Sequence, residues 1–428
     1  MKILTHLILF SFLSFAYFAK AVLYVDIREN TVAKIDLVVF KCACKTELGS
    51  KLNENITKII EADLSDSGFF YIERIIEDEI TMQKSIKVDI LATVSLIEIS
   101  DKALELSLHL FDTFTKSELF THSVIFLRKD WRKIAHFISD LIYVRLTGEN
   151  GYFNTKIAYI AEEKDNNDKF MRRIAIMNQD GSDIKYLTNG DKFVSSPRFV
   201  PNNNSIIYIL YLDDKSYLIS KNLKDNTESI INIFNGVISA PRFSSDGKFL
   251  LISYSFNGET NIFCLDLNSK NTRKITRSSA ISTSASFSPD QKYMVFSSDI
   301  SGSQQLYVID FAKKNKKPER ISFGNGKYIT SVWSPNGDLI AFIKVKLGKF
   351  YIGVMKPDGK EERILSEGYK IESPTWLPNS RGIIFTKMES SSNSKIYLLN
   401  LVKMNQRIIS TPTNAYLPDW SSYLPLIE

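Results

Sequence analysis

Histidine is scarce in this chain of 428 residues, and its distribution excludes one large class of enzyme. Only His6, His109, His122 and His136 occur, all before residue 150. A triad that activates a serine or cysteine nucleophile needs a histidine base, so no such triad can form within the last two thirds of the chain. The sequence also has no GxSxG, HExxH, CxxC, GxGxxG or phosphate-binding-loop motif.

Cysteine is equally scarce, and three residues cannot form a disulfide framework. Cys42 and Cys44 stand two apart on an expected strand and so share a face, whereas Cys264 falls inside another expected strand. A metal or redox site at Cys42 and Cys44 is one hypothesis. Core or surface thiols are the alternative that we favour, because no further clustered ligands are visible. No cofactor or metal ion is therefore expected.

Long apolar runs are absent after the N-terminus. Residues 1–21 combine Lys2, an apolar stretch from Leu7 to Phe18 and the small-x-small sequence Ala19-Lys20-Ala21, which is the pattern of a cleaved signal peptide. The mature chain would begin at Val22 and contain no transmembrane segment, because none of its apolar runs reaches the roughly 18 residues that a spanning helix needs. A retained N-terminal anchor is the alternative.

The overall composition is typical of a globular protein, with 44% hydrophobic and 24% charged residues. The length of the chain suggests two or three domains. This balance excludes a disordered or collagen-like chain. Residues 151–428 carry 36 basic and 27 acidic residues. The longest basic run, Lys313–Arg320, has no interleaved aromatic residues, so no nucleic-acid binding is expected.

The last two thirds of the chain repeat one pattern six times, with an aromatic residue in the same position of each copy. The copies include SAPRFSSDG, which ends at Gly247, and ITSVWSPNG, which ends at Gly337. Successive aromatic residues are 44, 44, 46, 43 and 44 residues apart, which is the period of a four-stranded propeller blade. These aromatic residues are Phe199, Phe243, Phe287, Trp333, Trp376 and Trp420.

Short apolar runs bounded by Asp-Gly or Asn-Gly turns supply the strands of each blade. Residues 151–428 are therefore predicted to form an all-β, six-bladed β-propeller. Its first strand, Lys156–Ile160, lacks a preceding aromatic-proline segment, and the segment around Trp420 has no strand after it. We expect the C-terminal strand to complete the blade that residues 156–188 begin, which would close the ring and remove its open edges.

Prolines stand two residues before four of the repeated aromatic residues, at Pro197, Pro241, Pro374 and Pro418. A strand that lines a central channel is paired on one side only, and it tolerates proline because the missing N–H would face the channel. The aromatic residues themselves are expected to pack between blades rather than to bind a ligand.

Residues 22–150 are predicted to form a smaller α/β domain, so that the whole chain is an α+β domain followed by the propeller. An amphipathic helix is expected from Leu52 to Leu64, with Gly68 as its C-terminal cap, and a second from Trp131 to Leu146. Strands are expected at residues 35–40, 89–97, 104–110 and 120–127. The lone histidines of this domain are expected to be structural, since a metal site needs three or four ligands.

The segments that lead into the six innermost strands would converge at one mouth of the channel. Their small and polar residues serve either as packing residues of tight turns or as a docking rim, since loops on rigid scaffolds often carry binding. The candidate rim residues are Ser195, Ser239, Ala240, Thr283, Ser284, Ile329, Glu372 and Tyr416. Lys327 and Arg242 would add a salt-dependent attraction if the basic excess faces a partner.

Several segments together resemble the TolB family of the Tol-Pal system. They are the signal peptide, the small α/β domain, the junction WRKIAHFISDLIYVRLTGENGYFNTKIAYIAE at 131–162, the SPDG-type repeats and the terminal LPDWSSYL. The resemblance covers essentially the whole mature chain. Its specific part is the junction and the terminal segment, because exported peptidases carry similar repeats.

The resemblance implies a periplasmic, non-enzymatic scaffold that supports outer-membrane integrity and constriction at cell division. In this family the propeller mouth docks the lipoprotein Pal, and the mature N-terminal segment docks the C-terminal domain of TolA. Other outer-membrane proteins are a further class of partner. Ala240 and Thr283 match rim positions linked to Pal. The TolA-binding segment would be Val22, Leu23, Tyr24, Val25, Asp26 and Ile27, which alternates like a strand that can augment a sheet edge.

Two other classes of function stay open. One is the propeller of an exported peptidase-like or carbohydrate-active protein that uses the channel as its site. The absence of histidine from residues 151–428 disfavours this class. The other is a metal- or ligand-binding module.

Overall fold

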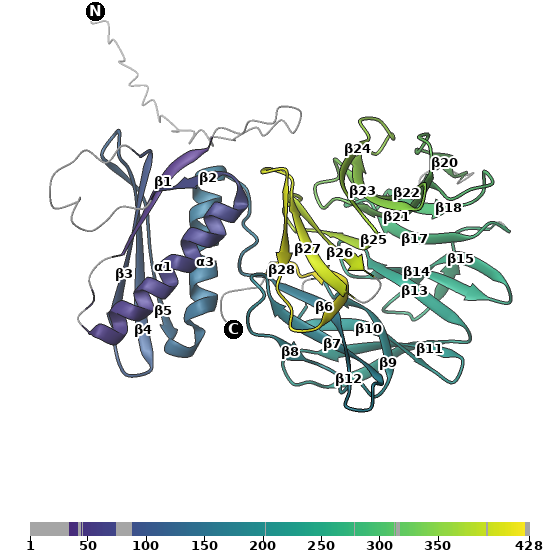
Figure 1. Ribbon diagram of the computed structural model, residues 1–428, viewed down its shortest axis with the longest axis horizontal. Helices are drawn as coiled ribbons and strands as arrows, with labels where there is room; N and C mark the ends of the chain where they lie inside the picture. Colours follow the sequence, from purple (N-terminus) through teal and green to yellow (C-terminus); the bar gives the residue numbers. More distant parts are fainter. Residues whose placement is uncertain are drawn as a thin grey trace, which may run out of the picture.

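A computed structural model describes residues 34–41, 44, 46–73, 88–201, 203–277, 279–311, 313, 317–390 and 393–423. The expected signal peptide and the segment Val22–Ile27 lie outside these residues. The chain folds as two bodies side by side, a small helix-and-sheet domain and a larger all-strand ring (Figure 1). No helix in the described part combines the length and apolar character needed to cross a membrane.

The smaller domain is one five-stranded sheet with two helices packed on one of its faces. The sheet order is β2-β1-β3-β4-β5, in which β1 runs parallel to both of its neighbours and the remaining pairs are antiparallel. Its elements are β1 (Ile35–Lys41), α1 (Glu47–Ser67), β2 (Phe70–Ile72), β3 (Ile90–Glu98), β4 (Ala103–Asp112), β5 (Ser117–Leu127), the short 3₁₀ helix η1 (Arg128–Asp130) and α3 (Trp131–Thr147).

Local chemistry favours the start of α1 and the C-terminal ends of both helices. The side chain of Thr46 accepts a hydrogen bond from the backbone N–H of Gly49 at 3.0 Å, which caps the first turn of α1. Gly68, at φ 91°, and Gly148, at φ 73°, end α1 and α3 in the left-handed conformation that glycine adopts without steric cost. The predicted helices and strands of this domain are confirmed, and the short strand β2 is one that the sequence pattern did not indicate.

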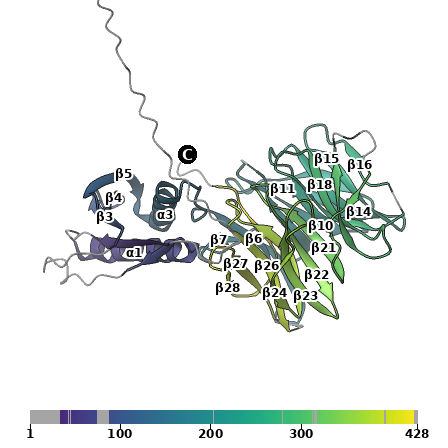
Figure 2. The ribbon, with the colours of Figure 1, turned by 90° about the horizontal axis from the view of Figure 1, so that it is seen from above.

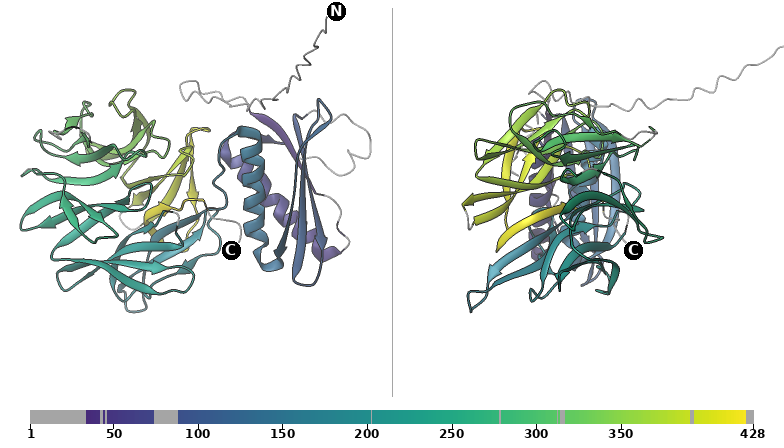
Figure 3. Two further views of the ribbon diagram at one scale, coloured as in Figure 1. Left: turned by 180° about the vertical axis from the view of Figure 1, so that it is seen from behind. Right: turned by 90° about the vertical axis from the view of Figure 1, so that its right-hand side faces the viewer.

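The larger body consists of six four-stranded antiparallel sheets, as the repeat predicts. Figure 3 shows the blades following one another around the ring from teal through green to yellow. The first three complete blades are β9 (Phe193–Phe199), β10 (Ser205–Leu212), β11 (Lys215–Asn222) and β12 (Glu228–Phe234); β13 (Val237–Phe243), β14 (Phe249–Phe256), β15 (Glu259–Asp266) and β16 (Thr272–Lys274); and β17 (Ser282–Phe287), β18 (Tyr293–Ser298), β19 (Gln305–Asp310) and β20 (Glu319–Arg320).

The remaining blades are built in the same way, except for the one that closes the ring. They are β21 (Lys327–Trp333), β22 (Ile340–Lys346), β23 (Lys349–Met355) and β24 (Arg363–Gly368); β25 (Lys370–Trp376), β26 (Gly382–Ser390), β27 (Asn393–Asn400) and β28 (Asn405–Ile409); and the closing blade, in the order β29 (Asn414–Trp420), β6 (Lys156–Lys164), β7 (Phe170–Asn178) and β8 (Lys185–Tyr186).

The closing blade confirms the predicted role of the C-terminal strand. β29 pairs antiparallel with β6, from Asn414 opposite Glu162 to Trp420 opposite Ile157. Beyond the strand, Ser421 and Lys156 exchange hydrogen bonds, both at 2.9 Å, and Trp420 Nε1 donates to Thr155 Oγ1 at 2.8 Å. The last described residues are thereby attached to the first strand of the propeller.

The repeated aromatic residues pack in the core between blades. Phe199, Trp333, Trp376 and Trp420 are at most 9% exposed, and each belongs to a hydrophobic cluster that draws on strands of adjacent blades. Phe243 and Phe287 are half-buried and pack against two further clusters of the same kind. The expectation that these side chains belong to the scaffold agrees with this arrangement.

One hydrophobic core extends across both bodies. It contains Ile56, Ile60 and Leu64 of α1, Ile138 and Ile142 of α3, and propeller residues such as Leu377, Ile384 and Trp420. Tyr143 belongs to this core and is fully buried, with its ring in edge contact with Phe69 and Phe153. Seen from above, α3 and one end of α1 lie on the side of the small domain nearest the propeller (Figure 2). The two domains are therefore packed together as well as linked.

Candidate partner-binding surfaces

The candidate rim residues occupy equivalent positions in the six innermost strands, β9, β13, β17, β21, β25 and β29. The residue five before each repeated aromatic is buried in all six strands, and the residue four before it is half-exposed in all six. This alternation is what a strand shows when one face packs between blades and the other faces an opening. The half-exposed residues are Ser195, Ser239, Thr283, Ile329, Glu372 and Tyr416.

The next residue in each of these strands is left-handed. Every innermost strand shifts its register against its neighbour at this point, as a β-bulge does. The bulge residues have φ between 48° and 54°, an uncommon conformation for residues other than glycine: Ser196, Ala240, Ser284, Thr330, Ser373 and Leu417. Uncommon backbone conformation of this kind often marks functional sites. Here it recurs next to the half-exposed rim residue in each of the six innermost strands.

Neighbouring side chains hold this bulged backbone in place. The N–H of Ser284 donates to Ser253 Oγ at 2.9 Å, and the N–H of Leu417 donates to Thr386 Oγ1 at 3.1 Å. Ser331 Oγ donates to the carbonyl of Ser284 at 3.2 Å, so adjacent blades are also joined here. The rim is therefore a pre-formed surface that a partner can meet without ordering it first.

Charge on the rim is sparse. Glu372 pairs with Lys370 at 2.8 Å, and Lys327 is exposed at the start of β21. Arg242, which the sequence analysis assigned to a partner-facing role, is instead almost buried inside the channel, where it faces Asp419. The reason is its position one residue before a repeated aromatic, which places it deeper in the channel than the rim.

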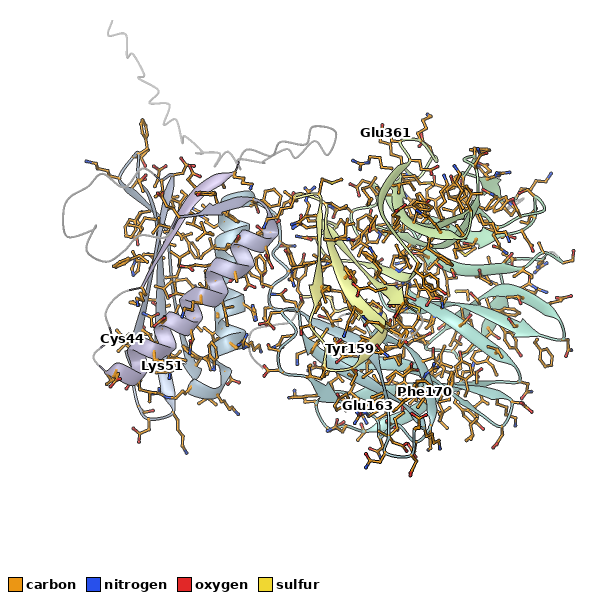
Figure 4. All side chains as sticks on the ribbon, viewed as in Figure 1. Cys44, Lys51, Tyr159, Glu163, Phe170 and Glu361 are labelled. Atoms are coloured by element: carbon orange, nitrogen blue, oxygen red, sulfur yellow. The ribbon has the colours of Figure 1, made fainter. Side chains whose placement is uncertain are left out.

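The TolA-type candidates Val22, Leu23, Tyr24, Val25, Asp26 and Ile27 lie outside the described residues, as does Cys42. Cys44 lies just before α1 in the small domain (Figure 4), and its Sγ is 3.6 Å from the carbonyl oxygen of Leu96. The described part of the chain contains no group of three or more His, Cys, Asp and Glu residues arranged to hold a metal ion. Cys264 is buried within β15.

A buried ionic cluster at the domain interface was not foreseen from the sequence. Nδ1 of His136, on α3, lies 2.7 Å from Oδ2 of Asp63 on α1, and its Nε2 lies 3.4 Å from Oδ2 of Asp180 after β7. Gln179 Nε2 donates to Asp63 Oδ1 at 2.8 Å, and Arg132 forms an ion pair with Asp180. The cluster thus connects both helices of the small domain to one turn of the propeller.

The charges of this cluster change the proton affinity of His136. Its side chain is 3% exposed, and burial alone would disfavour the imidazolium. The carboxylates of Asp63 and Asp180 outweigh that penalty and raise the pKa of His136 to about 10. The same contact with His136 overcomes burial at Asp180 and lowers the pKa of that carboxyl well below its usual range. In the sequence, the available signal for this cluster was the position of His136 within the predicted helix. In the structure, α3 is buried on more than one side, as a helix between two layers must be.

A second set of polar contacts closes the interface beside the linker. Arg381 Nε donates to Glu149 Oε2 at 2.9 Å in a two-pronged pair. Asp140 accepts hydrogen bonds from the N–H groups of Phe153 and Asn154 at 2.9 and 3.0 Å. Asn400 Nδ2 donates to backbone carbonyls at the end of α1. These contacts fix the direction in which the chain enters the propeller.

Comparison with known families agrees with both domains. The TolB amino-terminal domain matches residues 23–119, and the TolB beta propeller domain matches residues 143–424. A Tol-Pal system protein TolB of Wolbachia sp. subsp. Drosophila simulans (strain wRi) is 68% identical over 423 residues, which are 99% of this chain and 100% of the relative. A Tol-Pal system protein TolB of Gluconobacter oxydans (strain 621H) is 35% identical, over 87% of this chain and 84% of the relative.

A solved structure supports the arrangement of the two domains. The crystal structure of TolB from Acinetobacter baumannii superposes with a TM-score of 0.77, over 91% of this chain and 98% of that one. Its sequence is 22% identical to this chain, so the likeness concerns the fold alone.

Proposed function

This chain belongs to the TolB family of Tol-Pal system proteins, and on that basis we propose that it is a periplasmic scaffold that binds other proteins and catalyses no reaction. Pal would dock at the propeller mouth, and the C-terminal domain of TolA would bind the segment Val22–Ile27. The complex would support outer-membrane integrity and constriction during cell division. The proposed signal peptide at residues 1–21 would direct export.

The six-fold rim is the observation that carries the Pal proposal. Half-exposed side chains stand at one level around a pre-formed opening, each beside a bulged residue. Such a surface with little fixed charge suits a protein partner that inserts a loop or helix end, since pre-organised surfaces lose little entropy on binding. Ala240, Thr283 and Ser284 belong to two adjacent strands of this rim.

Binding of purified mature chain to purified Pal tests this proposal. We expect Thr283→Arg to weaken binding at least tenfold, which corresponds to about 1.4 kcal/mol, because the new side chain would fill the mouth. Thr272→Arg is the control, since Thr272 is exposed on β16, the outermost strand of the preceding blade. Equal affinities for the two variants, or no binding of the unmodified chain at micromolar Pal, would remove the rim from consideration.

The TolA proposal has its own test. A chain that lacks Val22–Ile27 should lose binding to the C-terminal domain of TolA, because an augmenting strand supplies its affinity through backbone hydrogen bonds that no other segment replaces. Pal binding by the same truncated chain serves as the control for folding. Retention of TolA affinity in the truncated chain would place that partner elsewhere on the molecule.

The enzymatic alternative makes a distinct prediction. A peptidase-like or carbohydrate-active propeller should turn over peptide or glycan substrates and lose that turnover when a rim carboxylate is removed, as in Glu372→Gln. Turnover with this dependence would replace the scaffold proposal, whereas Pal binding without turnover would support it.

A further inference from the structure

The six residues that directly precede the repeated aromatic residues form a second ring of side chains, inside the channel. One member comes from each innermost strand, and all six line a single cavity of about 300 Å³. They are Arg198, Arg242, Ser286, Val332, Thr375 and Asp419. Each member of this ring stands three residues after the half-exposed rim residue of the same strand. The ring is therefore separate from the surface proposed for Pal.

The ring contains two guanidinium groups and one carboxylate. Arg198 and Asp419 are buried, and Arg242 is mostly buried. The side chains of Arg198, Arg242 and Asp419 are 5%, 13% and 9% exposed. Oδ1 of Asp419 lies 3.7 Å from Arg198 Nη1 and 3.5 Å from Arg242 Nη1, so it is shared between them at long distance. Its Oδ2 is occupied by the N–H of Phe199 at 2.9 Å. One positive charge is left without a counter-charge in this ring.

Neutral oxygens accept four hydrogen bonds from the two guanidinium groups, and they contribute no counter-charge. Arg242 donates to Thr375 Oγ1 at 3.0 Å and to the Pro374 carbonyl at 2.8 Å. Arg198 donates from Nε to the Pro241 carbonyl at 3.1 Å and from Nη1 to the Pro197 carbonyl at 2.8 Å. Within the described residues, Nη2 of Arg198 has no acceptor.

An uncompensated buried charge of this kind is costly. Removing a charge from water costs free energy, which a partner of opposite sign offsets. Burial, and then the charge of Arg198, lower the pKa of Arg242 to about 9, against the opposing effect of Asp419. The two guanidinium groups therefore repel each other, and a bound anion would remove that repulsion.

We propose that the channel binds one small monovalent anion, a halide or a carboxylate, at Arg198 Nη2 between Arg198 and Arg242. A single negative charge brings the ring to neutrality, which favours a monovalent ion over phosphate or sulfate. The carboxylate can be that of a free acid or of a side chain that enters the channel. This inference rests on the ring alone and not on the proposed roles of Pal and TolA.

Bromide provides a direct test. Crystals of the mature chain grown or soaked in sodium bromide should give an anomalous peak within hydrogen-bonding distance of Arg198 Nη2. The logarithm of the folding constant should rise with the logarithm of bromide concentration with a slope near one above the dissociation constant, as one bound ion requires. Sodium sulfate at equal ionic strength serves as the reference salt, since the site is proposed to take a monovalent anion. Addition of acetate separates the two ligand sources: loss of the bromide peak indicates carboxylate binding, and its persistence restricts the site to halides.

Two variants complete the test. Arg198→Gln leaves the ring with one arginine and one aspartate, so the dependence of the folding constant on bromide concentration should be lost. Lys327→Gln, which removes an exposed cation at the start of β21, should keep the bromide dependence of the unmodified chain. The absence of an anomalous peak, or the same bromide slope in Arg198→Gln as in the unmodified chain, overturns the proposal. Should Arg198→Gln fail to fold, the bromide peak in the unmodified chain decides the question.

Discussion

At the scale of single residues, His136 shows how strongly surroundings control a side chain. It stands between two carboxylates from different domains, and its pKa is raised to about 10 although burial acts in the opposite direction. The unfolded chain has a histidine pKa near about 6.5. The folded state therefore binds an additional proton between these two values. Its stabilising effect is full below about pH 6.5 and is lost as pH rises toward about 10.

We predict that His136→Asn reduces the free energy of unfolding at pH 6 by about 3 kcal/mol, because it leaves buried carboxylates without their cation. The variant should also lose the part of the pH dependence that His136 contributes, so the difference from the unmodified chain should shrink between about pH 7 and 10. Urea unfolding across this pH range measures both effects.

His109→Asn is the control for this substitution. His109 pairs with Glu118 at the surface of β4 and β5, with both side chains more than a third exposed, so its contribution to stability should be below about 1 kcal/mol. A His136→Asn chain whose stability stays parallel to that of the unmodified chain at every pH would contradict the assigned proton linkage.

At the scale of elements, β29 determines whether the propeller is a ring or an open array. It supplies the innermost strand of the closing blade and contacts the next blade through β9. Without it, β6 would present an unpaired edge, and the core around Trp420 would lose an aromatic side chain. Closure is thus a property of one seven-residue strand at the end of the chain.

Deletion of Leu417–Glu428 should therefore prevent the propeller from forming a stable monomer. We expect aggregation, or a fall in the melting temperature of more than about 10 °C, since loss of a buried aromatic residue alone typically costs about 3–5 kcal/mol. Size-exclusion chromatography and thermal denaturation measure these outcomes.

A shorter deletion of residues 424–428 leaves β29 complete and is the matched control, which should melt like the full chain. If the longer deletion also melted like the full chain, the closing role of β29 would be disproved.

At the scale of the whole molecule, the two domains share a core and two polar interfaces. The hydrophobic cluster that contains α1 and α3 continues into the blades formed by β25–β28 and by β29 with β6–β8. The pair of Arg381 with Glu149 and the cluster around His136 lie along this interface. Since unfolding of either domain would expose part of this core, the two should unfold together.

We predict one cooperative transition for the mature chain in scanning calorimetry. Arg381→Glu should split it into two, because it places two carboxylates against each other at a mostly buried site and costs about 3 kcal/mol or more. Lys346→Glu, at an exposed end of β22, reverses a charge away from the interface and should leave one transition. Two transitions already present in the unmodified chain would show that the domains are not coupled.

The sequence by itself determined the number of blades, the closing strand and the C-terminal ends of both helices, whereas α1 begins at Glu47 rather than at the predicted Leu52. A fixed spacing between Phe199, Phe243 and the later aromatic residues leaves few alternatives, because each blade needs a set length of chain. Gly68 and Gly148 end their helices through local backbone conformation, which does not depend on distant residues. The same repeats identified the rim residues, although their role in binding stays a prediction.

Only the tertiary structure decided which distant side chains meet. Arg198 and Asp419 are far apart in the chain and become neighbours because the ring closes, and Asp63 and Asp180 approach His136 because two separate domains dock. Such contacts depend on the relative placement of rigid bodies, and no local periodicity encodes that placement. The proton affinity of His136 and the excess charge in the channel follow from it for the same reason, since both arise from burial and from charges on other elements.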